Sequence, residues 1–384
     1  MTAYGGEGTA GWATGIGADP VMKILIPDHV PESERKLIRE AAPDVDLLTL
    51  RATQRRSPLR AGLGWVLTRR MCPHGLYRRF RGAVASRARY EMEIDGGPLV
   101  VPRGDVEAFL ATWTITRELY QQIRPLLPGL RWIHSTMTGV DHLLPDEASP
   151  ARDSGLRVSC SRGVHSERIA EFAVTLIASV AKRLPDHARL QSRRAWRSLR
   201  SKELAGSIVA VVGAGSIGSA VARLARANGM RPIGIARHPR DAPAFEAVYG
   251  PDHLHAALAR ADFIVVCIPS TAETRGLVGA EALRAVRRDA YLVNVSRGSI
   301  VDEGALIAAL GARRIAGAAL DVFDDEPLPR NHPFYGREDV LVTHHSSYAS
   351  AASEREVFER FQRNVARYAR GEPLEGEIDV RLGY

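Results

Sequence analysis

The segment from Leu204 to Arg237 reads LAGSIVAVVGAGSIGSAVARLARANGMRPIGIAR and contains the signals that decide the fold. Residues Ile208 to Gly213 form a short β-branched run, which is typical of a buried parallel strand. A glycine turn follows at once, and apolar residues at helical spacing then continue to a stop at Asn228-Gly229. Pro232 to Ala236 reads as another strand. The segment therefore predicts a strand, a tight turn, a helix and a second strand in succession.

The turn has the spacing GxGxxG, at Gly213, Gly215 and Gly218. Gly213 permits the turn, Gly215 lets a pyrophosphate approach the bare backbone, and Gly218 lets the helix lie close to the strand. The phosphates would bind free N–H groups at the start of the helix, around Ser216 and Ile217. The spacing alone is also consistent with a simple glycine-rich turn. The strand before it and the helix after it favour a dinucleotide site.

The end of the second strand bears on which dinucleotide binds. A carboxylate there would hold the ribose 2′-hydroxyl of NAD, but the chain continues as Ala236-Arg237-His238-Pro239-Arg240. Arg237 and Arg240 would attract a 2′-phosphate. We therefore expect NADP(H) to be favoured over NAD(H). The alternative is that both arginines are ordinary solvated residues in a chain with 48 Arg and 4 Lys.

Length and composition indicate a globular protein with two domains. The chain has 384 residues, and no apolar run approaches the roughly 20 residues that cross a bilayer. The N-terminus shows no secretory signal, so we expect a cytoplasmic protein without membrane contact. Three separated cysteines form no CxxC and suggest neither disulfides nor a metal site. Residues 1 to 20 are rich in Gly, Ala and Thr, and we expect them to be disordered.

Residues 51 to 104 interrupt the first β/α units as a basic insertion. Arg51 to Arg89 holds eleven arginines and no acidic residue. Such a segment could form a surface for an anionic partner or a lid over an anionic substrate. It could equally be a solvated, partly helical insertion, and nucleic-acid binding is not favoured.

The remaining pattern predicts an α/β protein with two domains. We expect a doubly wound Rossmann sheet of six strands in a dinucleotide-binding domain, residues 162 to 345. A second, discontinuous flavodoxin-like α/β domain would bind substrate and comprise residues 21 to 161 and 346 to 384. Four strands are expected after the first two of the Rossmann sheet, at Asp262–Ile268, Tyr291–Val295, Ile315–Asp321 and Val340–Thr343.

Polar residues follow these later strands at their carboxyl ends, where ligands bind in such sheets. Arg297 follows the fourth strand, Asp321 to Glu326 the fifth, and His344-His345 the sixth. These residue types fit the reduction of a 2-oxo acid. Histidine can protonate the carbonyl oxygen, a carboxylate can stabilise imidazolium, and arginine can bind the substrate carboxylate. Each residue alone could be an ordinary loop residue, and their joint placement favours a site.

From about Leu130 onward the chain resembles the D-isomer-specific 2-hydroxyacid dehydrogenases. The matching motifs are Thr138-Gly139-Val140-Asp141, the glycine turn, Pro269-Ser270-Thr271-Ala272-Glu273-Thr274, Asn294-Val295-Ser296-Arg297-Gly298, Leu320-Asp321-Val322-Phe323 with Glu326-Pro327, and Thr343-His344-His345. The resemblance implies that Arg297 binds substrate, that Glu326 supports His345 as acid/base, and that backbone N–H groups around Thr138 and Gly139 hold the substrate carboxylate. It also implies that Asp321 contacts the nicotinamide amide, with Pro269, Thr274 and Ser296 near the cofactor.

Two further features refine the resemblance. Arg162-Gly163-Val164-His165-Ser166 and Ala236-Arg237 look most like the glyoxylate/hydroxypyruvate reductase branch, whose members commonly favour NADPH. A homodimer through the cofactor domain, including Pro185 to Trp196, is also implied. The chain departs from the family at His344, where proline is usual, and in its basic insertion.

Two alternative functions stay open at this point. One is another chemistry of the family, such as oxidation of 3-phosphoglycerate, phosphite or formate. The other is a non-catalytic, dinucleotide-sensing scaffold of the corepressor type, which only the basic insertion favours.

Overall fold

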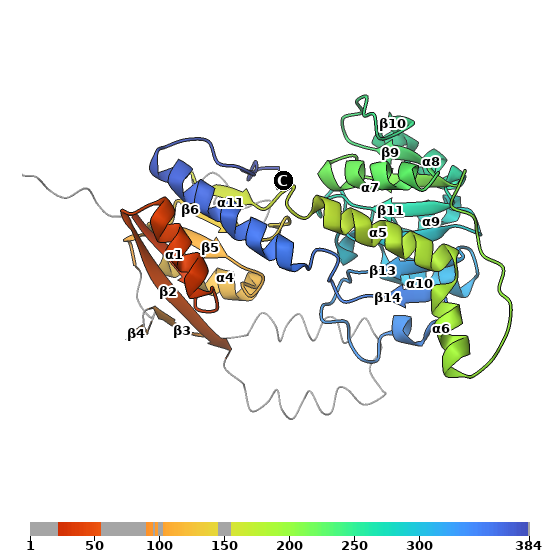
Figure 1. Ribbon diagram of the computed structural model, residues 1–384, viewed down its shortest axis with the longest axis horizontal. Helices are drawn as coiled ribbons and strands as arrows, with labels where there is room; N and C mark the ends of the chain where they lie inside the picture. Colours follow the sequence, from red (N-terminus) through yellow and green to blue (C-terminus); the bar gives the residue numbers. More distant parts are fainter. Residues whose placement is uncertain (1–21, 55–89, 95–96, 99–102, 145–154, 383–384) are drawn as a thin grey trace, which may run out of the picture.

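The computed structural model describes residues 22–54, 90–94, 97–98, 103–144 and 155–382. Two α/β domains lie side by side, each built on one seven-stranded sheet (Figure 1). The predicted fold class is therefore confirmed. The N-terminal segment expected to be disordered and residues 55–89 of the basic insertion lie outside the described residues.

The first sheet has the strand order β4-β3-β2-β1-β5-β6-β7. The strands are β1 (Met22–Pro27), β2 (Val45–Gln54), β3 (Tyr90–Ile94), β4 (Gly97–Pro98), β5 (Val106–Ala111), β6 (Trp132–Ser135) and β7 (Arg157–Cys160). The five neighbouring strands β2, β1, β5, β6 and β7 are parallel. Strands β3 and β4 are antiparallel additions at one edge. The parallel part has the flavodoxin-like order.

Both ends of the expected insertion differ from the prediction. Residues 51 to 54 continue β2 and pair with β3, so the sheet extends into the segment read as an interruption. Ala52 and Met92 pack on the core below, while Arg51 and Thr53 are exposed. This alternation covers only the last few residues of β2 and a short β3, which is too short a pattern to recognise in the sequence.

The second sheet has the order β10-β9-β8-β11-β12-β13-β14 and is parallel throughout. Its strands are β8 (Ile208–Val212), β9 (Arg231–Ile235), β10 (Ala247–Tyr249), β11 (Phe263–Val266), β12 (Tyr291–Asn294), β13 (Gly317–Leu320) and β14 (Val340–Val342). The sheet has seven strands instead of the expected six. The missed strand is β10, which has three half-buried residues and so lacks both a hydrophobic run and an alternation.

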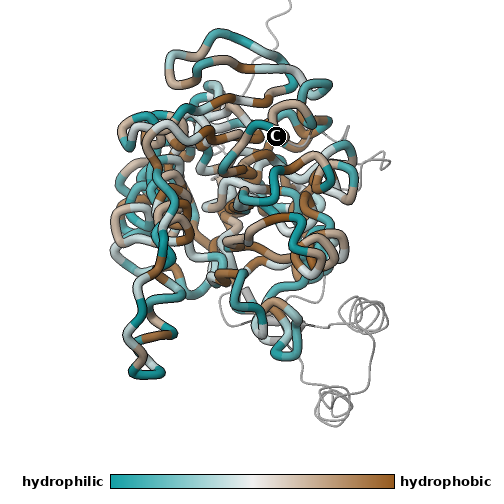
Figure 2. Tube along the Cα trace, turned by 90° about the vertical axis from the view of Figure 1, so that its right-hand side faces the viewer, coloured by the Kyte–Doolittle hydropathy of each residue, from teal (hydrophilic) through white to brown (hydrophobic). Residues whose placement is uncertain are grey.

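Helices cover both faces of the second sheet, as in a doubly wound fold. Within the described residues, the α-helices are α1 (Glu32–Ala41), α4 (Arg117–Ile123), α5 (Ser166–Ala181), α6 (Leu184–Ser192), α7 (Ser216–Ala227), α8 (Leu254–Arg260), α9 (Ala280–Ala285), α10 (Glu303–Gly311) and α11 (Ala351–Ala369). Helices α5 and α7 pack on one face, and α8, α9 and α10 on the other. The hydrophobic residues gather in the interior accordingly (Figure 2).

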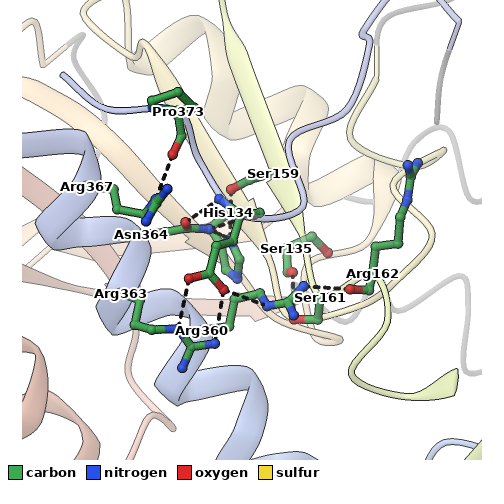
Figure 3. Close-up of polar contacts among 11 residues, drawn as sticks. His134, Ser135, Ser159, Ser161, Arg162, Arg360, Arg363, Asn364, Arg367 and Pro373 are labelled. Carbon is green, nitrogen blue, oxygen red and sulfur yellow. Dashed lines mark hydrogen bonds and ion pairs between the residues drawn. The ribbon is translucent and has the colours of Figure 1, made fainter. Parts of the chain in front are cut away.

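The C-terminal helix α11 packs on the first domain. Its Phe361 and Val365 are fully buried against β1, β5 and Trp132 of β6. Beside them, the amide of Asn364 donates to the backbone oxygen of Glu375 at 2.9 Å and lies 3.4 Å from Nδ1 of the buried His134 (Figure 3). Helix α11 therefore belongs to the same domain as β1. In the part of the chain that the structure describes, no helix combines the length and the apolar character needed to span a membrane.

Candidate active site

A cavity of about 860 Å³ lies between the two domains, at the carboxyl ends of both sheets. Its wall contains residues of the first domain, the turn before α7, the loops after β11, β12 and β14, and helix α11. Of the residues that the sequence predicts, the following line it: Thr138, Gly139, Gly215, Ser216, Ile217, Arg240, Pro269, Ser296, Arg297 and His345. Loops after parallel strands thus converge on one site, as the topology requires.

His345 is paired with Glu326 across two loops. Nδ1 of His345 lies 2.7 Å from Oε2 of Glu326, and the other carboxylate oxygen accepts a hydrogen bond from the Phe323 amide at 2.9 Å. An ionised carboxylate only accepts, so Nδ1 must be the donor and Nε2 is left for the cavity. His345 has a φ of +49°, and its amide donates to the Asp321 carbonyl at 2.7 Å.

Asp321 is completely buried beneath this histidine loop. One carboxylate oxygen accepts from the Thr343 hydroxyl at 2.7 Å and from the Ser346 amide at 3.1 Å. The other accepts from the Ser347 amide at 3.0 Å. The structure does not bring Asp321 to the cavity wall, where the resemblance places a nicotinamide contact. Because a buried carboxylate needs donors, the loop that carries His345 occupies both of its oxygens.

Arg297 reaches the cavity from the loop after β12. Its Nε donates to Oδ1 of Asp141 at 3.2 Å and its Nη1 to the Ser296 carbonyl at 2.9 Å. A Cβ on Gly139 would lie only 1.6 Å from Nη2 of Arg297, so a side chain there would push the guanidinium out of its present position. Burial alone would raise the pKa of Asp141. The positive charge of Arg297 and the hydrogen bonds to the carboxylate together outweigh burial, so the pKa lies below its ordinary value. Asp141 had no role assigned from the sequence, although it stands in a matching motif.

The Thr138-Gly139 loop is held by a second histidine that sequence reasoning missed. His165 is buried in the cavity wall, and its Nε2 lies 3.2 Å from the carbonyl oxygen of Thr136. Burial lowers the pKa of His165, so the ring is neutral and Nε2 is the donor. Tyr348 packs edge-on against this ring at 5.6 Å and against His345 at 6.1 Å. Only the placement of His165 in the Arg162–Ser166 motif hinted at it.

The glycine turn has the form that a bound pyrophosphate needs. Gly213 has a φ of +115°, and a Cβ on it would lie 2.7 Å from the Cys267 carbonyl oxygen. A Cβ on Gly218 would lie 1.7 Å from the Gly213 carbonyl oxygen, which shows how closely α7 approaches the strand. At Gly215 an added Cβ would meet nothing within 4 Å. The open position therefore lies at the helix N-terminus, where free N–H groups favour an anion.

The remaining predicted cofactor residues divide into two groups. Pro269 and Ser296 line the cavity, and Arg240 lines it as well. The residues named as lining the cavity do not include Thr274, whose hydroxyl donates to the Pro269 carbonyl at 2.7 Å and so shapes the turn. One continuous wall thus joins His345 and Arg297 to the helix N-terminus and to Arg240. An extended dinucleotide fits this arrangement.

Arg237 is likewise absent from the residues that line the cavity. It lies two residues beyond the end of β9, and its Nη2 donates to Oε2 of Glu273 at 2.7 Å. Glu273 comes from the loop after β11, in a motif for which the sequence predicted a cofactor contact through Pro269 and Thr274 only.

Comparisons with known proteins identify the family. The family model for the D-isomer specific 2-hydroxyacid dehydrogenase NAD binding domain matches residues 174–347. Mouse glyoxylate reductase/hydroxypyruvate reductase is 30% identical over 319 residues, which cover 78% of this chain and 94% of that relative. The chain belongs to the D-isomer specific 2-hydroxyacid dehydrogenase family. It is therefore an NAD(P)-dependent enzyme of this family.

Two further relatives extend the comparison. Glyoxylate reductase of Korarchaeum cryptofilum is 32% identical over 266 residues, 67% of this chain and 79% of the relative. Among solved structures, a family member from Xanthobacter autotrophicus in complex with NADPH and MES has a TM-score of 0.69 at 26% identity. That match covers 95% of this chain and 100% of the other. The expected family is thus confirmed.

Proposed function

We propose that this dehydrogenase reduces a small 2-oxo acid of the glyoxylate/hydroxypyruvate type to the D-2-hydroxy acid, with NADPH preferred as reductant. The observation that carries the proposal is that His345, whose Nδ1 lies 2.7 Å from Glu326, lines the same cavity as Arg297. The names of the mouse and archaeal relatives, a glyoxylate/hydroxypyruvate reductase and a glyoxylate reductase, support this choice of substrate.

Each group in the cavity has a distinct part in the reaction. The bound dinucleotide supplies the hydride for the substrate carbonyl carbon. His345 gives a proton from Nε2 to the carbonyl oxygen, and Glu326 stabilises the charged ring and holds its orientation. Arg297 binds the substrate carboxylate and polarises the carbonyl group. Backbone N–H groups around Thr138 and Gly139 hold the same carboxylate.

The cofactor preference follows from the charges near the end of β9. Arg240 lines the cavity, and Arg237 lies two residues beyond the end of β9, the strand end near which the ribose 2′-position binds in such folds. Their guanidinium groups would attract a 2′-phosphate. The solved Xanthobacter relative binds NADPH, which supports the same preference.

The proposed enzyme is a homodimer that associates through α6 and the segment after it. No residue of α6 is buried, and residues 191 to 198 are all exposed. This region projects from the cofactor domain (Figure 1) and carries two exposed apolar side chains, Leu184 and Trp196. Such a surface is stabilised when a second copy covers it.

The test is the initial rate of NADPH and NADH oxidation with glyoxylate and with hydroxypyruvate as acceptors. Turnover with both acceptors and a faster rate with NADPH are expected. Turnover with neither, in protein that binds a dinucleotide, would contradict the proposal, and 3-phosphoglycerate, phosphite and formate would then be tested in the oxidative direction. A rate preference for NADH would contradict the cofactor preference alone.

A further inference from the structure

A carboxylate from another loop lies near the end of β9, where the sequence after the strand has none. In NAD-binding Rossmann folds an acidic residue at this strand end accepts a hydrogen bond from the ribose 2′-hydroxyl. The chain has Arg237 in this region, but Oε2 of Glu273 lies 2.7 Å from its Nη2. Glu273 belongs to the loop after β11, and it lies 36 residues further along the chain than Arg237. The ribose-binding region therefore holds both a guanidinium and a carboxylate.

The loop that presents Glu273 is ordered by its own hydrogen bonds. The Thr274 hydroxyl donates to the Pro269 carbonyl at 2.7 Å and accepts from the Thr271 amide at 2.8 Å. Pro269, whose carbonyl accepts the first of these hydrogen bonds, lines the cavity. The position of Glu273 is thus tied to the cavity wall, while its side chain, 74% exposed, is free to change partner.

We propose that Glu273 is a second determinant of cofactor selectivity, which favours NAD(H) and so reduces the preference for NADP(H) set by Arg237 and Arg240. The inference rests on the proposed dinucleotide site, but it predicts the opposite effect to the two arginines. With NADH bound, Glu273 accepts the 2′-hydroxyl hydrogen bond and compensates the charge of Arg237. With NADPH bound, the 2′-phosphate pairs with Arg237, and the negative charge of Glu273 then lies close to the negative phosphate.

The cost of exchanging partners is small, which makes the two arrangements accessible. Both side chains of the pair are exposed, at 40% for Arg237 and 74% for Glu273, and exposed ion pairs contribute little free energy. A doubly charged phosphate a few ångströms from a carboxylate is unfavourable even with water present. Removing the carboxylate charge therefore changes NADPH affinity more than it changes the fold.

The experiment is a fluorescence titration of NADPH and NADH, without substrate, against the full-length wild type and Glu273→Gln. We expect the variant to bind NADPH roughly five- to tenfold more tightly because a like charge is lost. It should bind NADH about threefold more weakly because a charged acceptor becomes a neutral one. The ratio of the two dissociation constants then shifts by more than tenfold.

Glu246→Gln is the matched control. Glu246 pairs with Arg231 at 2.8 Å on the same sheet, so this variant changes the net charge equally and also breaks an exposed Arg–Glu pair. It should leave the ratio of dissociation constants unchanged. An unchanged ratio in Glu273→Gln, or an equal shift in both variants, would overturn the inference. Failure of the wild type to bind either dinucleotide would instead contradict the proposed function.

Discussion

His345 shows how much of the site depends on single residues. Its φ of +49° lies in the left-handed region, which costs roughly 1 to 3 kcal/mol for a residue with a side chain. The buried carboxylate of Asp321 offsets this cost, because it accepts hydrogen bonds from Thr343, Ser346 and Ser347 on either side. Asp321 therefore acts on the proposed acid/base through the backbone, which turns the ring toward Glu326.

Replacement of His345 tests the proposed proton donor. His345→Gln should reduce kcat by roughly 10² to 10⁴ because the carbonyl oxygen loses its proton source. The dissociation constant for NADPH should stay the same, since the helix N-terminus and Arg240, where the phosphates of the dinucleotide are expected, are unchanged. Initial rates and fluorescence titration measure the two quantities.

The adjacent histidine is the control for this experiment. His344 is exposed, and the carboxylate of Glu326 pairs with His345 instead of His344. His344→Gln should therefore keep nearly full activity. If His344→Gln lost activity while His345→Gln kept it, the assignment would be reversed.

At the scale of elements, the strand β8, the turn and helix α7 form the proposed phosphate site by close backbone packing. A side chain would collide with the backbone of Cys267 at Gly213 and with the backbone of Gly213 at Gly218. Gly215 is different, because its added Cβ would point into open space. The two outer glycines serve the fold, and the middle one leaves room for a ligand.

Gly215→Ala should separate these two functions. We expect an unchanged melting temperature, because the new methyl group meets no atom, and at least a roughly tenfold weaker affinity for NADPH, because the pyrophosphate must approach this backbone. Gly311→Ala in α10 also places a methyl group in open space, away from the cavity, and should leave the NADPH affinity unchanged. Unaltered NADPH binding in Gly215→Ala would argue against a phosphate at this turn.

At the scale of the whole molecule, the packing of α11 on the first domain makes stability depend on pH. His134 of β6 is fully buried, with Nδ1 2.8 Å from the Ser159 hydroxyl (Figure 3). Burial, assisted by the charge of Arg360, lowers the pKa of His134 to about 3. The native state thus keeps this ring neutral, whereas the unfolded chain protonates it near pH 6.5.

The contribution of His134 to the free energy of unfolding should therefore be fully present above pH 6.5 and decline as the pH falls toward 3. For one such histidine the free energy of unfolding should drop by about 2 kcal/mol between pH 7 and pH 5. Urea unfolding at both pH values measures this difference. In His134→Gln the difference should be smaller by about this amount, even if the variant is less stable at pH 7. An identical difference in both proteins would mean that His134 does not contribute.

The exposed region around Trp196 gives a prediction about assembly. Trp196 has an exposed fraction of 103% and Leu184 of 54%, values that are costly for a lone chain in water. Trp196→Glu should convert the proposed dimer to a monomer, as measured by light scattering after size-exclusion chromatography. The exposed Trp113 lies in the cavity wall, so Trp113→Glu serves as the matched control and should keep the wild-type mass. A monomeric wild type would reject the proposed dimer.

The sequence by itself determined the features that depend on neighbours along the chain. The strand, glycine turn and helix of the Rossmann unit follow from local periodicity and from glycines that no other residue replaces. The parallel topology then predicted that Arg297, Glu326 and His345 follow strands that end at one edge. Short or irregular elements were missed, such as β10 and the extension of β2, because three or four residues contain too little pattern.

Only the tertiary structure decided which distant groups become partners. Asp321 supports the loop of His345 because burial commits both of its oxygens to backbone and hydroxyl donors. Glu273 reaches Arg237 because β11 and β9 flank β8 in the same sheet, although 36 residues separate the pair. Contacts between side chains on different loops depend on strand order, register and rotamer together. Local sequence patterns specify none of these alone, which is why the pairing of Arg237 with Glu273 became visible only in the folded chain.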